Sequence, residues 1–171
     1  KKYDEIILLH FDAHADLRES YNNEKYSHAS AIKRCLDYKN VKVISFGIRN
    51  LSKQEMNFYN ENRDRIEIFW AKDKNNWNLE KLDKLFKDKN VYITFDVDCF
   101  DCSIMPATGT PEPGGLTWEE ALLVIKKICQ LSNIIGADIN ELAPIKNFDS
   151  YNFLTAKLAY KILAYIFEFK N

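Results

Sequence analysis

Five short runs of apolar residues, rich in β-branched and aromatic side chains, alternate along the chain with longer stretches of helical period. The runs are Glu5–Phe11, Val41–Phe46, Ile66–Trp70, Val91–Phe95 and Ile134–Ile139. Strict alternation of this kind predicts parallel strands joined by crossover helices, because a tight turn cannot connect parallel neighbours. We therefore expect an α/β fold in which helices cover both faces of a mostly parallel sheet, a three-layer α-β-α arrangement.

Helix signals fill the intervals between the predicted strands. Capping boxes, in which a serine or threonine stands three residues before a glutamate, occur at Ser52 with Glu55 and at Thr117 with Glu120. Further helices are expected in HASAIKRCLDY after Ser27, in LEKLDKLF with Asn78 as its N-cap, and over about Tyr151–Phe167.

The composition narrows the classes of function. The 171 residues carry a formal net charge of −1, and 46% of them are hydrophobic. This balance provides no basic surface for nucleic acid or an anionic membrane, and no apolar run approaches the roughly 20 residues of a membrane span. Without a repeat, a linker or a low-complexity segment, the chain is expected to be one domain over residues 1–171, with no nucleic-acid or membrane partner.

The four cysteines, Cys35, Cys99, Cys102 and Cys129, follow no zinc-ribbon spacing. Cys99 and Cys102 could form a redox pair, but they do not open a helix as a thioredoxin-like motif does. Reduced thiols in a cytoplasmic protein are the simpler interpretation.

Acidic residues follow two of the predicted strands. DAHAD, residues 12–16, comes after the first run, and Asp96 and Asp98 come after Val91–Phe95. Ligands of parallel sheets bind at the carboxyl ends of the strands. Side chains two residues apart on extended backbone point the same way, so Asp12 is expected to converge with His14, and Asp96 with Asp98.

Bunched carboxylates repel one another unless a cation neutralises them, so these segments predict a metal site. Oxygen-rich ligands favour Mn²⁺ or Mg²⁺ over Zn²⁺, and so many acids suit two ions that share bridging carboxylates. An Asp-x-Asp pair after a strand is also common as a turn or a helix cap, which remains the alternative for each segment taken alone. The stretch PATGTPEPGGLTWEEAL, residues 106–122, follows the second segment and is expected to wall a pocket, with a plain connector into the helix after Thr117 as the alternative.

Three dispersed motifs together resemble the ureohydrolase family, the arginase and agmatinase group. They are FDAHADLR, FDVDCFDCSIMPATGTPEPGGL, and DINELAP followed by FDSYNFLTAKLAYKIL, and the similarity runs from about Ile7 to Ile166. The details DLRESY and YSHAS look more like agmatinases than arginases. The resemblance implies an arginase-like fold and a cytoplasmic hydrolase of polyamine biosynthesis that converts agmatine to putrescine and urea with two Mn²⁺ ions.

The resemblance also implies the metal ligands. Asp12 and Asp96 would bridge both ions, Asp16 would bind one of them, and His14 with Asp98 would bind the other.

Two further residues match catalytic positions of the family. His28, in YSHAS, matches the histidine that shuttles protons, although it could simply belong to a first helical turn. Glu141, in NELAP, matches the acid that binds the guanidinium group, although it could be a loop or cap acid. His10 matches no ligand and is expected to pack or to support a ligand.

The chain departs from the family pattern upstream of the first motif. The family's sixth ligand, a histidine in a Gly-Gly-acid-His motif, has no match among these residues, so we expect an N-terminally truncated enzyme with one incomplete ion site. Cys102 and Ala107 replace a usual proline and glycine, which affects the pocket wall and not the ligands. The full-length protein is expected to form a homotrimer or homohexamer, as family members usually do.

Three alternatives stay open. An arginase or a guanidinobutyrase would act on a different small guanidino substrate. A non-catalytic relative, or an inactive fragment, would bind metal weakly. A related metal-dependent deacetylase is disfavoured by the spacing of DAHAD and DINELAP.

Overall fold

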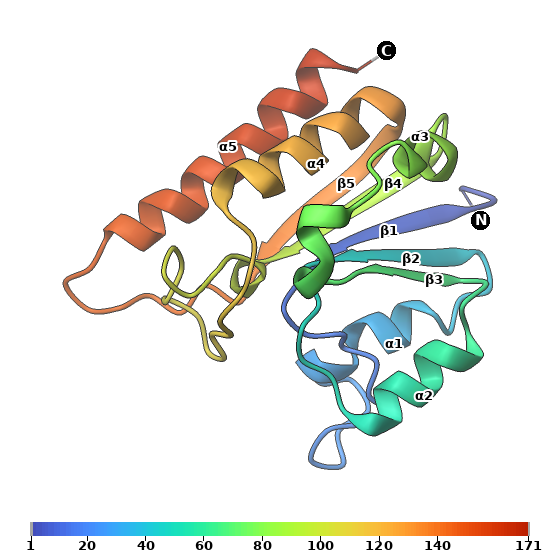
Figure 1. The fold of residues 1–171 in the computed structure, drawn as a ribbon, viewed down its shortest axis with the longest axis horizontal. Coiled ribbons are helices and arrows are strands. Elements are labelled where there is room, and N and C mark those ends of the chain that lie inside the picture. The colour runs from blue at the N-terminus through green and yellow to red at the C-terminus, as the bar shows by residue number, and fades with distance from the viewer. Residues whose placement is uncertain (1, 171) are drawn as a thin grey trace.

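The computed structural model describes residues 2–170 and has a parallel sheet at its centre (Figure 1). The strand order is β3-β2-β1-β4-β5, and every pair of neighbours is parallel. The strands are β1 Ile6–Phe11, β2 Val41–Phe46, β3 Ile66–Phe69, β4 Asn90–Asp96 and β5 Asn133–Asn140. All five predicted strands are confirmed, with ends that differ by one residue at most.

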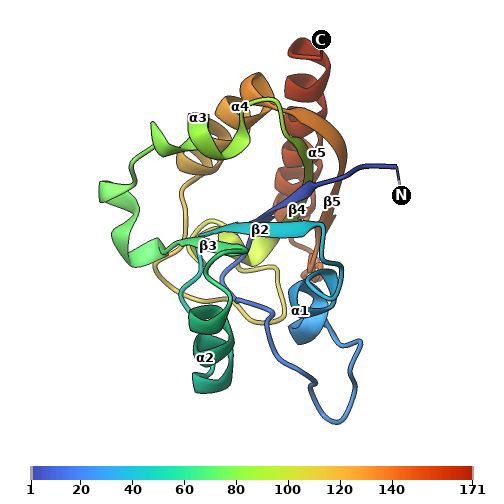
Figure 2. The same ribbon diagram turned by 90° about the vertical axis from the view of Figure 1, so that its right-hand side faces the viewer.

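Helices cover both faces of the sheet, so the predicted three-layer α-β-α class is confirmed. Figure 2 shows α1 and α2 on one face and α3, α4 and α5 on the other. Their bounds are α1 Ala31–Cys35, α2 Lys53–Glu61, α3 Lys81–Phe86, α4 Trp118–Leu131 and α5 Ser150–Glu168. Three 3₁₀ segments lie between these elements, η1 His28–Ser30, η2 Ala71–Asn76 and η3 Val97–Cys99. None of the helices in the described part of the chain is both long and apolar enough to cross a bilayer.

The starts of the helices show where local sequence signals succeed. Both predicted capping boxes form, at Ser52 with Glu55 and at Thr117 with Glu120. The expected helix start at Leu79 is wrong, because Asn78 Oδ1 accepts a hydrogen bond from Glu80 N at 3.0 Å and holds a turn there, and α3 begins only at Lys81. The helix predicted after Ser27 is also shorter than expected, since it opens as η1 and α1 ends at Cys35.

The core consists of two apolar clusters, one on each face of the sheet. On the face covered by α4 and α5, Phe11 stacks between Phe46 and Phe95, with ring centroids 5.5 and 4.9 Å apart. Phe11 and Phe46 are the last residues of β1 and β2, and Phe95 is the second-last residue of β4. The segments that follow these strands therefore leave from a rigid, fully buried platform.

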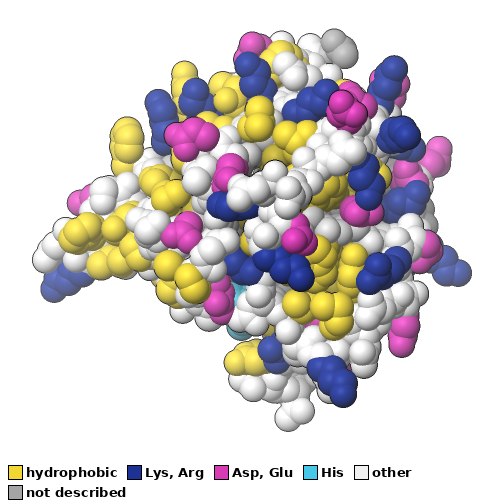
Figure 3. Space-filling model, in the orientation of Figure 1, with side chains coloured by type: hydrophobic (Ala, Val, Ile, Leu, Met, Phe, Trp, Pro, Cys, Tyr) yellow, Lys and Arg dark blue, Asp and Glu magenta, His cyan; other side chains and the backbone are white. Residues whose placement is uncertain are grey.

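β5 forms one edge of the sheet, and an apolar groove of about 600 Å³ lies beside it on the face that carries α1. Ile6, Leu8 and Ile32 line this groove together with Tyr92 and Ile135. Large apolar side chains are also exposed along α5, as the yellow surface over that helix in Figure 3 shows. Some of the apolar surface of β5 and α5 is therefore in contact with solvent.

Candidate metal centre

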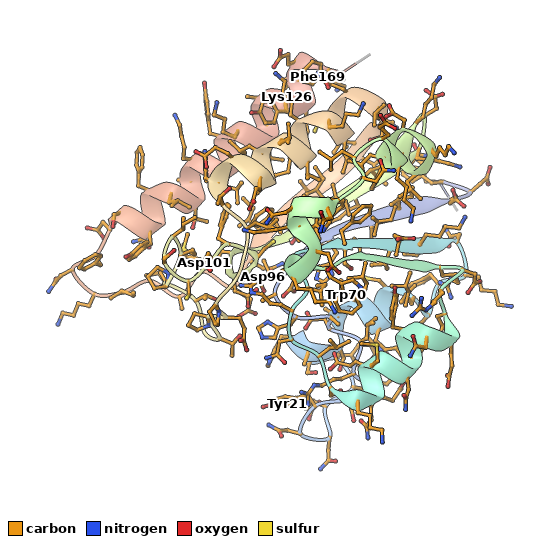
Figure 4. The ribbon with its side chains drawn as sticks, viewed as in Figure 1. Tyr21, Trp70, Asp96, Asp101, Lys126 and Phe169 are labelled. Atoms are coloured by element: carbon orange, nitrogen blue, oxygen red, sulfur yellow. The ribbon has the colours of Figure 1, made fainter. Side chains whose placement is uncertain are left out.

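The pairing of β1 with β4 brings the two acidic segments together. Phe11 lies opposite Phe95 in the register, so Asp12 and Asp96 follow at adjacent strand ends. Both carboxylates are buried, with 3% and 7% of their surface exposed. Figure 4 labels Asp96 at this end of the sheet, where the connecting loops gather.

The backbone after β1 turns so that the acids of DAHAD face one another. Asp12 Oδ1 accepts a hydrogen bond from His14 N at 2.6 Å, and His14 Nδ1 lies 3.0 Å from Asp98 Oδ2. Asp16 has a φ of 52°, in the left-handed region that few non-glycine residues adopt. Such strain at a polar residue is found where the surrounding structure fixes its position.

The segment after β4 differs from the extended backbone that the sequence suggested. Val97–Cys99 forms the 3₁₀ turn η3, and Asp96 caps it by accepting a hydrogen bond from Asp98 N at 2.8 Å. Asp98 Oδ1 in turn accepts from Ala13 N at 3.0 Å, which ties the two acidic segments together. Asp96 therefore caps a turn and also lies near Asp98, so the two interpretations of this segment hold together. The 3₁₀ turn, and not the alternation of side chains along a strand, brings Asp98 close to Asp96 and to the segment after β1.

Burial and the proximity of other carboxylates dominate the electrostatics of this cluster. Burial, with the nearby Asp12 and Asp98, raises the pKa of Asp96 to about 10. Burial, with the nearby Asp12, raises the pKa of Asp16 to about 8. Two carboxylates that hold protons at neutral pH mark a site where a positive charge would be strongly favoured.

The histidines compensate part of this charge. Hydrogen bonds to Asp12 and Asp98 raise the pKa of His14 to about 10. Burial alone would raise the pKa of Asp12, but hydrogen bonds from His10 and His14 lower it to about 2. Within residues 2–170, no lysine or arginine forms an ion pair with Asp12, Asp16, Asp96 or Asp98.

The donor atoms fit a divalent cation. Those of Asp12, His14 and Asp98 lie within 4.8 Å of one another, and so do those of His10, Asp12 and Asp16. Asp12 belongs to both groups, as a carboxylate that bridges two ions would. The predominance of oxygen donors suits Mn²⁺ or Mg²⁺ better than Zn²⁺.

A cleft of about 420 Å³ opens over this cluster. Every residue that the sequence singled out for metal binding or catalysis lines it, namely Asp12, His14, Asp16, Asp96, Asp98, His28 and Glu141. The structure therefore brings together side chains that are up to 129 positions apart, the distance from Asp12 to Glu141.

His28 and Glu141 reach the cleft from separate loops, and both are exposed. His28 opens η1, and its ring meets Tyr21 edge to face with centroids 5.5 Å apart. Glu141 directly follows β5 with a φ of 60°. The next residue, Leu142, bridges to Thr108, so the loop after η3 also positions the segment that carries Glu141.

Residues outside the predicted ligand and catalytic set hold the loop after η3 against the centre. The Arg49 guanidinium donates to the Asp98 carbonyl at 2.8 Å and to the Glu112 carbonyl at 2.7 Å. Asp101, labelled in Figure 4, accepts hydrogen bonds from the Gly114 and Gly115 amides at 2.7 and 3.1 Å. A side chain at position 115 would come within 2.5 Å of Asp101 N, so the close approach needs glycine. Arg49 carries no local sequence signal and could not have been found without the fold.

Comparison with known proteins gives consistent results. A family model described as the arginase family matches residues 1–167. The chain is 36% identical over 163 residues to N(1)-aminopropylagmatine ureohydrolase of Synechocystis sp., covering 94% of this chain and 52% of that protein. It is 36% identical over 165 residues to agmatinase of Bacillus subtilis, covering 95% of this chain and 54% of that protein. The chain thus spans about half the length of these curated relatives.

Solved structures agree with the fold. Agmatine ureohydrolase of Thermoplasma volcanium superposes with a TM-score of 0.80 at 30% identity, covering 95% of this chain and 55% of that one. Arginase from Medicago truncatula superposes with a TM-score of 0.76 at 26% identity, covering 95% of this chain and 52% of that one.

Proposed function

The chain belongs to the arginase family, and from this premise we propose that it carries the catalytic centre of a binuclear manganese amidinohydrolase. The reaction is the hydrolysis of a small guanidino compound to urea and an amine, with agmatine as the substrate and putrescine as the second product. One observation carries the proposal: a bridging-type cluster of buried acids, an exposed histidine and an exposed glutamate line the same cleft.

The proposed ligand roles are those that the resemblance to the family implies, and the grouping of donor atoms around Asp12 supports them. Asp12 and Asp96 would bridge two ions, Asp16 would bind one ion, and His14 with Asp98 would bind the other. When bound, two divalent ions supply Lewis acidity and a hydrolytic nucleophile at neutral pH. The chain's own contribution is to hold these donors in place, through the hydrogen bond from Ala13 N to Asp98 and the one from Asp98 N to Asp96.

Glu141 is proposed to bind the guanidinium group of the substrate. A carboxylate pairs with a guanidinium through two parallel hydrogen bonds, which fix the plane of the group as well as its distance. The left-handed backbone at Glu141 and the bridge from Leu142 to Thr108 hold this carboxylate at the wall of the cleft. Its role is therefore to present the central carbon of the guanidinium toward the acid cluster.

His28 is proposed to deliver the proton that the leaving amine needs. An imidazole exchanges protons readily near neutral pH, and an exposed one can recharge from solvent. The position of His28 between bulk water and the cleft suits this transfer. Tyr21, packed against the ring, limits its orientations.

Agmatine is favoured because both curated relatives described above are named for hydrolases of agmatine or an agmatine derivative. The assay that tests this proposal is urea release from agmatine, N(1)-aminopropylagmatine, arginine and 4-guanidinobutyrate with added Mn²⁺. Faster turnover of arginine or of 4-guanidinobutyrate would contradict the substrate assignment and leave the reaction class standing.

A second candidate function is metal binding with little turnover. It is favoured by the donor group at Asp16, where the imidazole within residues 2–170 is that of His10, which is buried and does not line the cleft. We expect weak or single-ion occupancy and low urea release from the 171 residues, and a trimer or hexamer as the assembly of the full-length enzyme. Metal analysis, light scattering and urea assay on the same preparation test this expectation, and two tightly held ions with full turnover would contradict it.

A further inference from the structure

Two polar side chains lie within the sheet directly beneath the acid cluster. His10 on β1 and Ser45 on β2 are opposite each other in the register, and only 2% and 3% of their surfaces are exposed. Their neighbours on these strands, such as Leu9 and Ile44, are apolar and buried. An imidazole and a hydroxyl in such surroundings cost free energy unless both are hydrogen-bonded, so their contacts indicate what they are for.

The contacts form a chain that ends at Asp12. His10 Nε2 lies 2.9 Å from Asp12 Oδ2, and His10 Nδ1 lies 3.1 Å from Ser45 Oγ. A carboxylate can only accept, so in the neutral ring Nε2 carries the hydrogen and donates it to Asp12. Nδ1 is then the acceptor for the Ser45 hydroxyl. Asp12 therefore sets the tautomer of His10, and the Ser45 hydroxyl, which can donate or accept, satisfies Nδ1 and holds the ring in place.

We propose that His10, held by Ser45, is a positioning residue that fixes the plane of the bridging carboxylate of Asp12. This inference rests on the proposed function, in which Asp12 is shared by two ions. The two oxygens of Asp12 are restrained separately, Oδ1 by His14 N at 2.6 Å and Oδ2 by His10 Nε2 at 2.9 Å. A carboxylate hydrogen-bonded at both oxygens is restrained against rotation, so its remaining lone pairs would be offered to a bound cation in fixed directions.

His10 lies within β1 and does not line the cleft in which the substrate would bind. Asp12 lines the cleft, whereas His10 is not among the described residues that do so. The competing role is direct ligation, because the donor atoms of His10, Asp12 and Asp16 lie within 4.8 Å of one another. A glutamine at position 10 separates the two roles, since its amide N–H extends about as far as Nε2 and can donate, but an amide is a poor replacement for an imidazole ligand.

The test is the affinity of the 171-residue chain for Mn²⁺, measured from the electron paramagnetic resonance signal of the free ion. His10→Phe, which fills the space without a donor, is expected to weaken binding by about 10–100-fold. His10→Gln is expected to stay within about threefold of the unsubstituted chain, and Ser45→Ala to fall between the two. Unchanged binding by His10→Phe, or equal losses in His10→Phe and His10→Gln, would overturn the positioning role.

Two controls keep this result interpretable. Cys129→Ala truncates a buried side chain of α4, away from the cleft, and is expected to lower Tm without changing Mn²⁺ affinity. A long-range ¹H–¹⁵N spectrum of the metal-free chain is expected to show His10 protonated at Nε2, and the opposite tautomer would contradict the hydrogen-bond chain. If the unsubstituted chain binds no Mn²⁺, the proposed function fails and this role with it; if it binds and His10→Phe binds equally, only this role fails.

Discussion

Asp96→Asn removes the negative charge that Asp96 would offer to a bound cation and changes almost nothing else. The amide has nearly the volume of the carboxyl group, and its oxygen can still accept the hydrogen bond from Asp98 N that caps η3. Because burial, with Asp12 and Asp98, raises the pKa of Asp96 to about 10, the metal-free chain holds this side chain neutral at pH 8. A neutral amide in its place is therefore expected to leave the metal-free Tm unchanged within about 2 °C.

Asp96→Asn should lower the affinity for Mn²⁺, and therefore the stability of the metal-bound state, much more than it changes the metal-free Tm. A unit charge about 4 Å from a monovalent partner contributes about 4 kcal/mol at an effective dielectric constant of about 20. A 100-fold loss of Mn²⁺ affinity, about 2.7 kcal/mol, is thus a conservative expectation. Mn²⁺ at about 100 times the unsubstituted chain's Kd should stabilise that chain by about 2.7 kcal/mol and the variant by only about 0.4 kcal/mol. For a domain of this size these energies correspond to Tm increases of about 5–11 °C and about 1–2 °C.

The assay is thermal unfolding at pH 8 with EDTA and with Mn²⁺, paired with urea release from agmatine. Asp138→Asn is the matched control, because Asp138 is a strand aspartate that accepts from Thr94 Oγ1 at 2.9 Å and lies outside the cleft. We expect the control to keep the Mn²⁺-dependent increase and Asp96→Asn to lose both the increase and any urea release. A full Mn²⁺-dependent increase in Asp96→Asn would refute the assignment of Asp96 as a metal ligand.

Further substitutions test the other residues of the cleft. Glu141→Gln keeps the shape of the side chain but removes its charge, so kcat/KM for agmatine should fall at least 100-fold, about 2.7 kcal/mol, while the Mn²⁺-dependent increase in Tm stays intact; loss of that increase would show a structural role instead. His28→Asn should lower kcat by about 10²–10⁴-fold with metal affinity unchanged, and an unchanged kcat would exclude proton transfer by His28. For the metal-free chain, the pKa values of Asp16 and His14 are raised to about 8 and about 10, so the folded state binds more protons than the unfolded state, and stability should fall as the pH rises from 5.5 to 8.5. Thermal unfolding in EDTA across this pH range measures the direction of the change. Asp16→Asn should make the fall in stability with pH less steep. A steeper fall in Asp16→Asn than in the unsubstituted chain would contradict the raised pKa of Asp16.

Much of the fold could be predicted from local pattern. The strands are short apolar runs bounded by polar or turn-forming residues, and these boundaries confine them to within a residue of the predicted ends. The capping boxes at Ser52 and Thr117 form because each needs only a partner three residues away. The prediction that Asn78 is the N-cap of a helix is wrong for a related reason, because an asparagine side chain stabilises a turn as readily as a helix start.

The gathering of the predicted residues at one cleft could be expected from the sequence, but the geometry of the cleft could not. Aspartates that follow neighbouring strands must lie near each other once the sheet forms, and the register of β1 with β4 brings Asp12 beside Asp96. The supports of the site were not predictable, because they join segments that are distant in sequence. Arg49 donates to carbonyl groups 49 and 63 positions away, and His10 meets Ser45 only through the pairing of β1 with β2.

We infer that the acid cluster at the ends of β1 and β4 binds Mn²⁺. The most direct measurement is an anomalous-difference map at the manganese absorption edge from crystals of the 171-residue chain grown with Mn²⁺. We predict a peak in contact with Asp12, His14 and Asp98, with a second and weaker peak beside Asp16. A map with no peak at these carboxylates, or with manganese bound only elsewhere, would contradict the claim.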